Sequence, residues 1–525
     1  MKRTIDISRR EPRPSCGHPL SAAFKNSLSR GRSLFTAALL CGALSGCTVG
    51  PKYHPPVVQP PAAFKQPPAP PAGAGTWTVA QPQDSKIRGN WWEIFNDAEL
   101  NSLESQLNIN NQNIKVAFEN FMQARALIGE ARAQYYPTAG TTPAFNRARS
   151  SSNLSNTPSA NTGKESTIYS LPIDISWAPD LWGRVRNAVH ASQYSAQVSA
   201  ADLENEKLIE QASLAEYFFE IRGQDALIRL YDETISADTQ TLNLTQALYD
   251  TGIGDYLAVA EAQSTLQSVQ AEATNLTIFR AQYEHAIAVL VGKAAPDFSV
   301  PVRPLTTAPP SIPIGLPSEL LERRPDVAAA ERLMAADNAR LGIAYTAFYP
   351  TLTLSVAGGM QSSPFTRLLD WPSRFWSIGP SISQPLFQAG LTSALHQYVA
   401  IYNADVANYR QTILTAFQQV EDSLTATQVL STQIQQQQQA IASAQKAYDL
   451  EMVRYQTGVD PYLDVVVLQN TLLADQQALA NLQVEQMSNA VLLVEALGGG
   501  WDRTQLPTPK EVSANPPKAD TRIQR

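Results

Sequence analysis

The sequence of 525 residues predicts a mixed α/β membrane protein that contains two copies of one unit. The stretch "YDTGIGDYLAVAEAQ" at 249–263 returns as "YQTGVDPYLDVVVLQ" at 455–469, and 10 of 24 positions are identical between 247–270 and 453–476. Long proline-free stretches carry an apolar residue at every seventh position, and shorter runs between them alternate apolar with polar residues. These patterns predict long helices, amphipathic strands and an internal two-fold sequence repeat.

Composition excludes several classes of protein. The formal charge is −7, and residues 1–46 hold eight basic and two acidic side chains, so the rest of the chain carries −13 (−7 − 6). This balance argues against a nucleic-acid partner, because phosphate binding needs a basic surface. All three cysteines lie within residues 1–47 and the five histidines are scattered. The sequence shows no catalytic arrangement, so we predict neither an enzyme nor a cofactor or metal site.

Residues 1–46 are predicted to be a signal peptide. The 11 uncharged, apolar residues Leu34–Leu44 follow a basic segment and are too few to span a bilayer. They end in "LSGC", which resembles a bacterial lipobox and predicts that Cys47 becomes the acylated (palmitate-bearing) first residue of the mature chain. Thr48 follows instead of Asp, which by family analogy permits sorting to the outer membrane. The alternative is an ordinary signal peptide that happens to contain a cysteine.

Residues 47–90 are predicted to be a lipid-anchored, proline-rich tether, because ten prolines fall between 51 and 82. The next element is a helix over about 97–135, with Asp97 as its N-cap.

Strand pairs are predicted at about 137–178 and 350–387, where apolar and polar residues alternate. Such runs fit transmembrane β-strands, and a soluble β-sandwich is the alternative. Aromatic residues at the strand ends favour the membrane: Tyr135, Tyr136, Trp177, Phe348, Tyr349, Trp371 and Phe375. Four strands cannot close a barrel, and an open edge in lipid leaves backbone groups unpaired. Two copies would pool eight strands and three would pool twelve, which leaves room for a passage.

Two long helices are predicted over about 184–250 and 391–456, each about 100 Å long at 1.5 Å per residue. Their apolar stripes recur every seven residues, which is typical of a coiled-coil seam. Each ends in a Tyr-x-Thr-Gly turn and is followed by a return helix of about 55 Å, over 255–291 or 461–497. The helix at 97–135 is expected to stack end to end with the first return helix.

These elements divide the mature chain into four parts after the tether. The first repeat covers 91–300, a linker follows at 301–317, and the second repeat covers 318–500. The remaining residues, 501–525, are predicted to be a polar, loosely ordered tail.

Several stretches resemble the TolC-like outer membrane factors, and in particular the NodT-type lipoproteins of RND multidrug efflux systems. The most specific is "IPIGLPSELLERRPDVAAAERLMAADNARLGIAYTAFYPTLTL" at 312–354. The others are "WWEIFNDAELNSLESQLNINNQNIKVA" at 91–117, "WAPDLWGRVRNAV" at 177–189 and "SQPLFQAGL" at 383–391. The resemblance covers roughly residues 47–500.

This resemblance implies a homotrimer with a 12-stranded β-barrel in the outer membrane, four strands per protomer, continuous with a long periplasmic α-helical barrel. It implies a passive exit duct for small molecules, including drugs, that an inner-membrane RND pump passes on through a periplasmic adaptor. The alternatives are the exit channel of a type I protein-secretion system, a periplasmic coiled-coil scaffold or adaptor, and an envelope hydrolase. The amphipathic strands distinguish the duct from the scaffold, which needs none.

The resemblance also assigns roles to the repeated turns, which are expected to dock the adaptor. The docking residues are Tyr249, Thr251, Gly252, Ile253, Tyr455, Thr457, Gly458 and Val459. The alternative is that the motif is turn chemistry only. The two turns are not equivalent, because Arg454 in the second is Leu248 in the first. We expect Asp460 and Pro461 to be the N-cap and first residue of the second return helix.

Asp464 lies just inside the second turn, where the first copy has Ala258. Matching the family's motif places Asp464 near its aspartate constriction at the periplasmic gate. Three copies would form an acidic ring that favours cations. The alternative is that Asp464 only offsets the dipole of the helix that it begins.

Overall fold

The computed structural model describes residues 48–56, 60–61, 64–65, 89–151, 153, 164–312 and 322–514. The predicted signal peptide and Cys47 lie outside these residues. The chain divides into two units, Met1–Cys47 and Thr48–Arg525, and only the second is described below. In the part of the chain that the structure describes, no helix is both long enough and apolar enough to cross a membrane.

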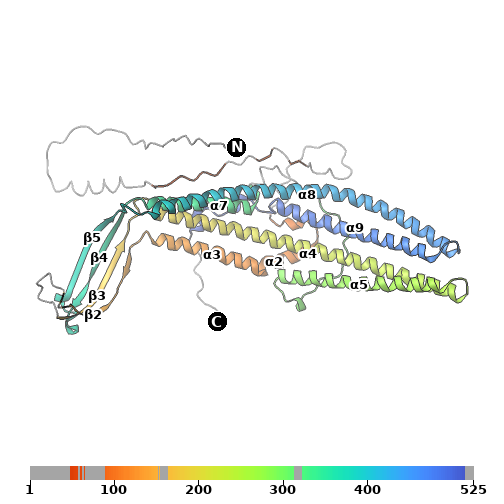
Figure 1. Cartoon of the computed structure of the whole chain (residues 1–525), viewed down its shortest axis with the longest axis horizontal. Coiled ribbons are helices and arrows are strands. Elements are labelled where there is room, and N and C mark those ends of the chain that lie inside the picture. The colour runs from red at the N-terminus through yellow and green to blue at the C-terminus, as the bar shows by residue number, and fades with distance from the viewer. Residues whose placement is uncertain are drawn as a thin grey trace. The chain divides into compact units, whose positions relative to one another are not determined.

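Two helical hairpins of equal dimensions dominate the fold (Figure 1). Helices α4 (Arg184–Asp250) and α8 (Gly390–Gln456) have 67 residues each, and the return helices α5 (Tyr256–Leu290) and α9 (Tyr462–Ala496) have 35 each. The bounds in the second hairpin are those of the first plus 206. The prediction of two long helices and two shorter return helices is confirmed to within one residue at each end.

The predicted helix at 97–135 is two helices, α2 (Ala98–Asn110) and α3 (Gln112–Ala133). Asp97 caps α2 as expected, because its carboxylate accepts from the backbone N–H groups of Glu99 and Leu100 at 2.9 and 3.2 Å. The prediction of one continuous helix is wrong, because the backbone at Asn111 leaves the helical region with φ −56° and ψ 131°.

Asn111 serves three elements at this break. Its side-chain oxygen accepts from the N–H of Ile114 at 3.0 Å and so caps α3. Its amide donates to the Glu210 carboxylate of α4 at 2.8 Å and to the Leu290 carbonyl at the end of α5 at 3.1 Å. The start of α3 therefore meets the end of α5, as the expected end-to-end stacking requires.

The motif at Arg323–Val327 forms the matching junction in the second half. Helix α7 (Pro325–Thr346) has 22 residues, as α3 has, and begins with proline at its first position. The Arg324 guanidinium donates to the Ala496 carbonyl at the end of α9 at 2.9 Å and pairs with Asp326 at 2.6 Å. Arg324 thus satisfies a free carbonyl of α9 where α7 begins.

The strands form one antiparallel sheet at the end of the helices opposite to the two turns (Figure 1). It contains β1 (Thr138–Gly140), β2 (Ala144–Arg149), β3 (Glu165–Trp177), β4 (Thr351–Ser362) and β5 (Arg374–Ser383). Strands β1 and β2 both pair with β3, which pairs with β4, which pairs with β5. The sheet therefore has four strand positions, and β1 and β2 share one.

The first predicted strand is interrupted, which corrects the expectation of a continuous one. Gly140 pairs with Asp174 and Ala144 pairs with Ser170, so the gap between β1 and β2, residues 141–143, lies opposite Pro172 and its two neighbours. Proline offers no N–H to the ladder, and Pro143 lies in the gap itself. The Thr141 hydroxyl donates to the Pro172 carbonyl at 2.6 Å, so a side chain replaces the missing backbone pairing.

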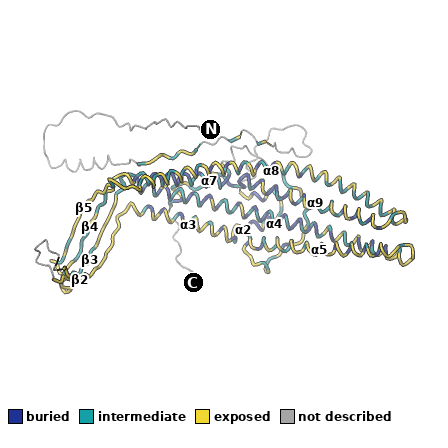
Figure 2. The backbone as a smooth tube through the Cα atoms, viewed as in Figure 1, coloured by how far each residue is buried: buried dark blue, intermediate teal, exposed yellow. Residues whose placement is uncertain are grey.

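The core lies midway along the helices, where burial is greatest (Figure 2). The short 3-10 helix η2 (Trp91–Phe95) packs its aromatic rings there, with the rings of Phe95 and Phe219 5.0 Å apart. On the predicted seam, Leu214, Ile221 and Val420 are fully buried. The other short helices are η3 (Ala295–Asp297), η4 (Phe365–Arg367), η5 (Trp371–Ser373), η6 (Arg503–Gln505) and α10 (Pro509–Val512).

The described parts of the predicted tether and tail are packed against the helices. The Tyr53 hydroxyl donates to the Glu331 carboxylate at 2.7 Å, and the Lys65 backbone N–H donates to Glu421 at 2.6 Å. Val512 is buried beside Ile128, and the Arg125 guanidinium donates to the Val512 carbonyl at 3.3 Å. The expectation of a loosely ordered tail is therefore wrong for residues 501–514, and Tyr53 and Lys65 of the predicted tether contact the helices.

Candidate functional site

The sheet has one apolar and one polar face, as the alternation predicts. Directly paired residues share a face, so Ile175, Val356 and Ile378 lie side by side. This face is exposed: Trp376 and Ile378 are 76% and 71% accessible. Its larger apolar members are Phe145, Tyr169, Leu171, Ile173, Ile175, Trp177, Leu352, Leu354, Val356, Met360, Trp376, Ile378, Pro380 and Ile382. An exposed apolar face of this extent is typical of a lipid-facing surface.

The apolar face is about as tall as a membrane. From Tyr169 to Trp177 it runs eight residue steps along β3, roughly 26 Å at 3.3 Å per residue, which is close to the length of a tilted transmembrane strand. At one end Tyr169 stacks between Phe145 and Phe365, with centroids 4.9 and 5.3 Å away. At the other end the Trp177 indole donates to the Tyr135 carbonyl at 3.0 Å. Aromatic residues at both ends match the girdles of outer-membrane barrels.

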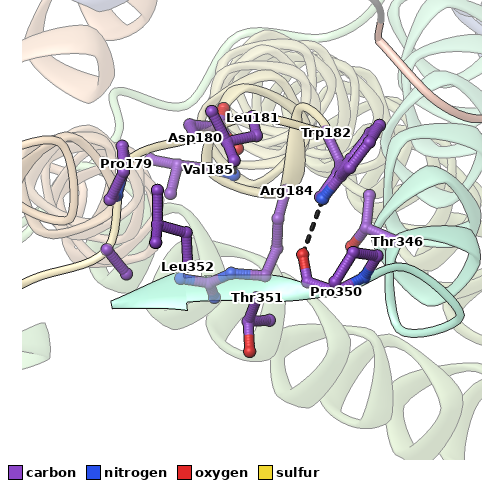
Figure 3. A pocket seen from close by; sticks show the side chains of 11 residues that line it. Pro179, Asp180, Leu181, Trp182, Arg184, Val185, Thr346, Pro350, Thr351 and Leu352 are labelled. Carbon is purple, nitrogen blue, oxygen red and sulfur yellow. Dashed lines mark hydrogen bonds between the residues drawn. The ribbon is translucent and has the colours of Figure 1, made fainter. Parts of the chain in front are cut away.

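The elbow, defined as residues 178–185 and 346–352, joins the sheet to α4 and α7 around a small pocket (Figure 3). The Asp180 carboxylate accepts from the N–H groups of Val185 and Arg186 at 3.1 and 2.9 Å and so caps α4. The Trp182 indole donates to the Pro350 carbonyl at 2.7 Å (Figure 3). The "WAPDLWGRV" motif therefore fixes the angle at which the sheet meets the helices.

Thr48, the first residue that the structure describes, is wedged into this elbow. Its hydroxyl accepts from the Arg186 guanidinium at 2.8 Å, and the next N–H, of Val49, donates to the Trp182 carbonyl at 3.1 Å. Gly183 has φ +83°, and a Cβ there would lie 2.9 Å from the Thr48 methyl group. The chain immediately after Cys47 is thus held at the boundary between sheet and helices.

The first tip, residues 249–256, is the turn between α4 and α5. Gly252 has φ +73°, the left-handed region that glycine tolerates best. The N–H of Ile253 donates to the Leu248 carbonyl at 2.9 Å, which closes the end of α4. The Asp255 carboxylate then caps α5 by accepting from the N–H groups of Leu257 and Ala258.

The second tip, residues 455–462, repeats this backbone with different polar contacts. Gly458 has φ +74°, and the Val459 N–H donates to the Arg454 carbonyl at 2.9 Å. Pro461 occupies the cap position and supplies no side-chain hydrogen bond. Asp460 forms an ion pair with Arg454 instead. The prediction that Asp460 caps α9 with Pro461 as its first residue is wrong by one position, since α9 begins at Tyr462.

The predicted docking residues lie together at each tip. Thr251 and Thr457 each donate their hydroxyl to two carbonyls of the preceding helix turn, at 3.0 Å. The rings of Tyr249 and Tyr256 are 5.5 Å apart, and those of Tyr455 and Tyr462 are 5.3 Å apart. Ile253 and Val459 are 78% and 63% exposed. Each tip therefore presents an exposed apolar side chain on a braced turn.

Asp464 is exposed in the first turn of α9, beside a charged cluster. Arg454 approaches Glu451 at 3.9 Å in addition to its pair with Asp460. Burial, reinforced by Asp460 and Asp464, raises the pKa of Glu451. The hydrogen bond from Arg454 lowers the pKa of Asp460. The second tip thus carries three carboxylates around one guanidinium.

The sequence comparison of the copies missed Glu451 and the partner of Arg454. The signal was present, because the first copy has Leu248 and Gly254 where the second has Arg454 and Asp460. Both members of the ion pair change together between the copies. The tips also contact each other, since Ala262 of α5 is buried with Tyr462 and Val465 of α9.

Comparison with known proteins gives concordant matches. A family model described as outer membrane efflux protein matches residues 103–293 and 316–499. The toluene efflux pump outer membrane protein TtgC of Pseudomonas putida is 30% identical over 491 residues, 93% of this chain and 99% of the relative. The solvent efflux pump outer membrane protein SrpC of the same species is 31% identical over 479 residues, 90% and 99% of the two chains.

A solved structure of the outer-membrane channel OprN has a TM-score of 0.75 at 27% identity and covers 87% of this chain and 100% of that one. The resemblance to outer membrane factors inferred from the sequence is confirmed.

Proposed function

The chain belongs to the outer membrane efflux protein family, and we propose that it is the outer-membrane exit duct of a tripartite efflux system. The observation that carries the proposal is that the two ends of the helices have different surfaces. A sheet with an exposed apolar face lies at one end of the helices, and two braced tips lie at the other. Such a chain reaches from the membrane to partners about 100 Å away, at 1.5 Å per helical residue.

The duct exports small molecules passively, after an inner-membrane RND pump has passed them on through a periplasmic adaptor. Relatives are named for toluene and solvent efflux, which favours small organic compounds, drugs among them. The test is a strain lacking its own exit duct but holding the cognate adaptor and pump. Expression of this chain is expected to restore resistance to the exported compound. Unchanged sensitivity, with the protein present in the outer membrane, would contradict the proposal.

A trimer completes the sheet. The four strand positions end in open edges at β1 and β2 on one side and at β5 on the other. An unpaired edge in lipid costs several kcal/mol for each free backbone group, so the edges of neighbouring copies are expected to pair. Three copies make a 12-stranded barrel wide enough for a passage. Native mass spectrometry should show the homotrimer; a monomer or dimer alone would contradict it.

Cys47 anchors the chain to the outer membrane through acylation. The support is the position of Thr48, which is held at the elbow where the apolar face ends. A lipid on the preceding residue would enter the membrane at that level. Intact-mass measurement should show a lipid-modified N-terminus at Cys47. Cys47→Ala is expected to leave the trimer in the membrane, because the sheet supplies insertion and one lipid chain alone anchors only marginally.

The two tips dock the adaptor, and Asp464 lines the periplasmic gate. Exposed Ile253 and Val459 supply apolar contacts at the tips. Asp464 carries an exposed carboxylate where Ala258 carries none, and three copies make an acidic ring that favours cations. Co-purification with the adaptor tests docking: Ile253→Asp together with Val459→Asp should lose the adaptor and keep the trimer.

A further inference from the structure

The polar face of the sheet carries one charge in its middle. Along the described strands, this face consists mainly of hydroxyl, glycine, alanine and amide groups, with Ile168, Pro172 and Phe375 as its larger apolar members, and Asp174 of β3 is its one ionisable side chain. The charged residues of the opposite face, Arg147, Arg149, Glu165 and Arg374, all lie toward the end of the sheet far from the elbow. Hydroxyl-bearing members of the polar face are Ser170, Ser176, Thr353, Ser355, Ser377 and Ser381.

The neighbours of Asp174 leave its carboxylate uncovered. It is paired with Gly140 on β1 and with Ala357 on β4, and Ala357 is paired with Ser377 on β5. A Cβ built on Gly140 would meet nothing within 4 Å. Asp174 is exposed, and no described side chain forms an ion pair with it. The residues beside it therefore neither neutralise nor shield the charge.

Local folding does not explain an aspartate at this position. Aspartate is disfavoured within strands, and none of its nearest neighbours on the same face is charged: Pro172 and Ser176 along β3, Gly140 on β1 and Ala357 on β4. The carboxylate caps no helix, because β3 continues for three residues to Trp177. At 3.3 Å per residue Asp174 lies roughly 13 Å along β3 from residue 178, where the elbow begins, and so within the extent of the apolar face.

From this placement we infer that Asp174 is a charge-selecting residue of the passage, and that solutes carrying positive charge pass it more readily than anions. The inference rests on the proposed function, since only a closed barrel turns the polar face inward. Three copies then place three carboxylates at one level of the pore, the arrangement by which charged rings favour cations. This level is a filter separate from Asp464, which lies at the far end of the helices.

The first test locates the side chain. Asp174→Cys, Ser176→Cys and Ile173→Cys are made in the full chain, which has no cysteine after Cys47. Thiol reagents that carry a charge and do not enter lipid should label positions 174 and 176 and spare position 173. Labelling of 173 in preference to 174 would overturn the inference by reversing the two faces.

The second test measures selectivity. Purified wild-type protein, Asp174→Asn and Asp370→Asn are recorded in planar bilayers with a potassium chloride gradient. Asp370 lies in the loop between β4 and β5, so this control removes the same charge outside the sheet. Asp174→Asn should lower the ratio of potassium to chloride permeability roughly threefold at low salt, with less effect at high salt. The control should leave the ratio near that of the wild type.

The outcomes separate the two proposals. Conducting channels whose ion preference is the same in wild type and Asp174→Asn would overturn the role of Asp174 and leave the duct intact. The absence of conducting channels in every variant, wild type included, would overturn the duct and the inference with it.

Discussion

The two tips share a backbone and differ in their charges. Both turn on a glycine near φ +73°, both close the long helix with the same hydrogen bond, and both stack a pair of tyrosines. The first is tied by the Asp255 cap, and the second by the Arg454–Asp460 ion pair. The repeated motif therefore specifies the turn, and the residues that vary around it specify what each tip does.

A charged cluster distinguishes the second tip from the first. In each protomer the second tip carries a formal charge of −2, because Glu451, Asp460 and Asp464 contribute −3 and Arg454 contributes +1. At the four matching places the first repeat has Thr245, Leu248, Gly254 and Ala258, which carry no charge. In the function that we propose, the first tip is an attachment point, and the second is both an attachment point and a gate.

The largest expected effect follows from breaking what the tips share. Gly252→Val and Gly458→Val force a β-branched residue into the left-handed region, which costs roughly 1–2 kcal/mol or more. Each variant should distort its turn, release the adaptor and abolish most of the export. The measurement is the growth-inhibiting concentration of an exported compound, with adaptor co-purification alongside.

Gly129→Val is the matched control for both glycine variants. Gly129 lies within α3, and a Cβ there would meet nothing within 4 Å. Full resistance in the two tip variants would show that turn geometry is not needed for docking.

A charge cycle at the second tip should give intermediate effects. In each protomer, Arg454→Leu changes the formal charge of the second tip from −2 to −3, and Asp460→Gly changes it from −2 to −1. The double variant has the residues of the first tip at both positions and returns the charge to −2. In planar bilayers, cation preference should rise about twofold in Arg454→Leu and fall about twofold in Asp460→Gly. In the double variant it should return near the wild-type value. A double variant that behaves like either single variant would contradict the assignment of charge to selectivity.

The pH dependence of the second tip follows from the same pair. Because Arg454 lowers the pKa of Asp460, the pair stabilises the folded turn above the ordinary aspartate pKa of about 3.9. That contribution is lost as the pH falls through the lower folded value. Wild-type channels should keep their cation preference at pH 4 better than Arg454→Leu channels do. Identical titration of the two proteins would argue against the ion pair in the assembled channel.

The smallest effect is expected at the first tip. Asp255→Ala removes the cap of α5, a change that typically costs about 1 kcal/mol. The amides of Leu257 and Ala258 should exchange hydrogen about fivefold faster. Pro461→Ala, at the matching place, removes no cap and should leave the start of α9 unchanged. Equal effects of the two variants would show that the Asp255 cap does not distinguish the first tip from the second.

The sequence predicts the long helices well, because proline is absent from them and the seven-residue stripe runs through 214–249 and 420–455. It fails at junctions that depend on a distant partner. Asn111 breaks the predicted helix without glycine or proline, because its amide reaches Glu210 and the end of α5. The gap in the first strand depends on Pro172, which lies opposite residue 142 in the sheet but 30 residues later in the sequence.

The candidate site follows the same division. Gly252 and Gly458 are predictable, because few other residues suit a left-handed turn. The Arg454–Asp460 pair joins residues on either side of that turn, and it becomes visible only when both differences between the copies are considered together. The packing of the tail is not predictable from its sequence, because its few apolar residues are separated by polar ones and the burial of Val512 depends on α3 and α4.

Single-channel recording of Asp464→Ala tests the central comparison most directly. Asp250→Ala is the matched control, since Asp250 is an exposed aspartate at the end of α4 beside the first tip. The account predicts a several-fold higher conductance and a weaker cation preference for Asp464→Ala, and wild-type behaviour for Asp250→Ala. Unchanged conductance and cation preference in Asp464→Ala, or equal changes in the two variants, would contradict the assignment of the gate to the second tip.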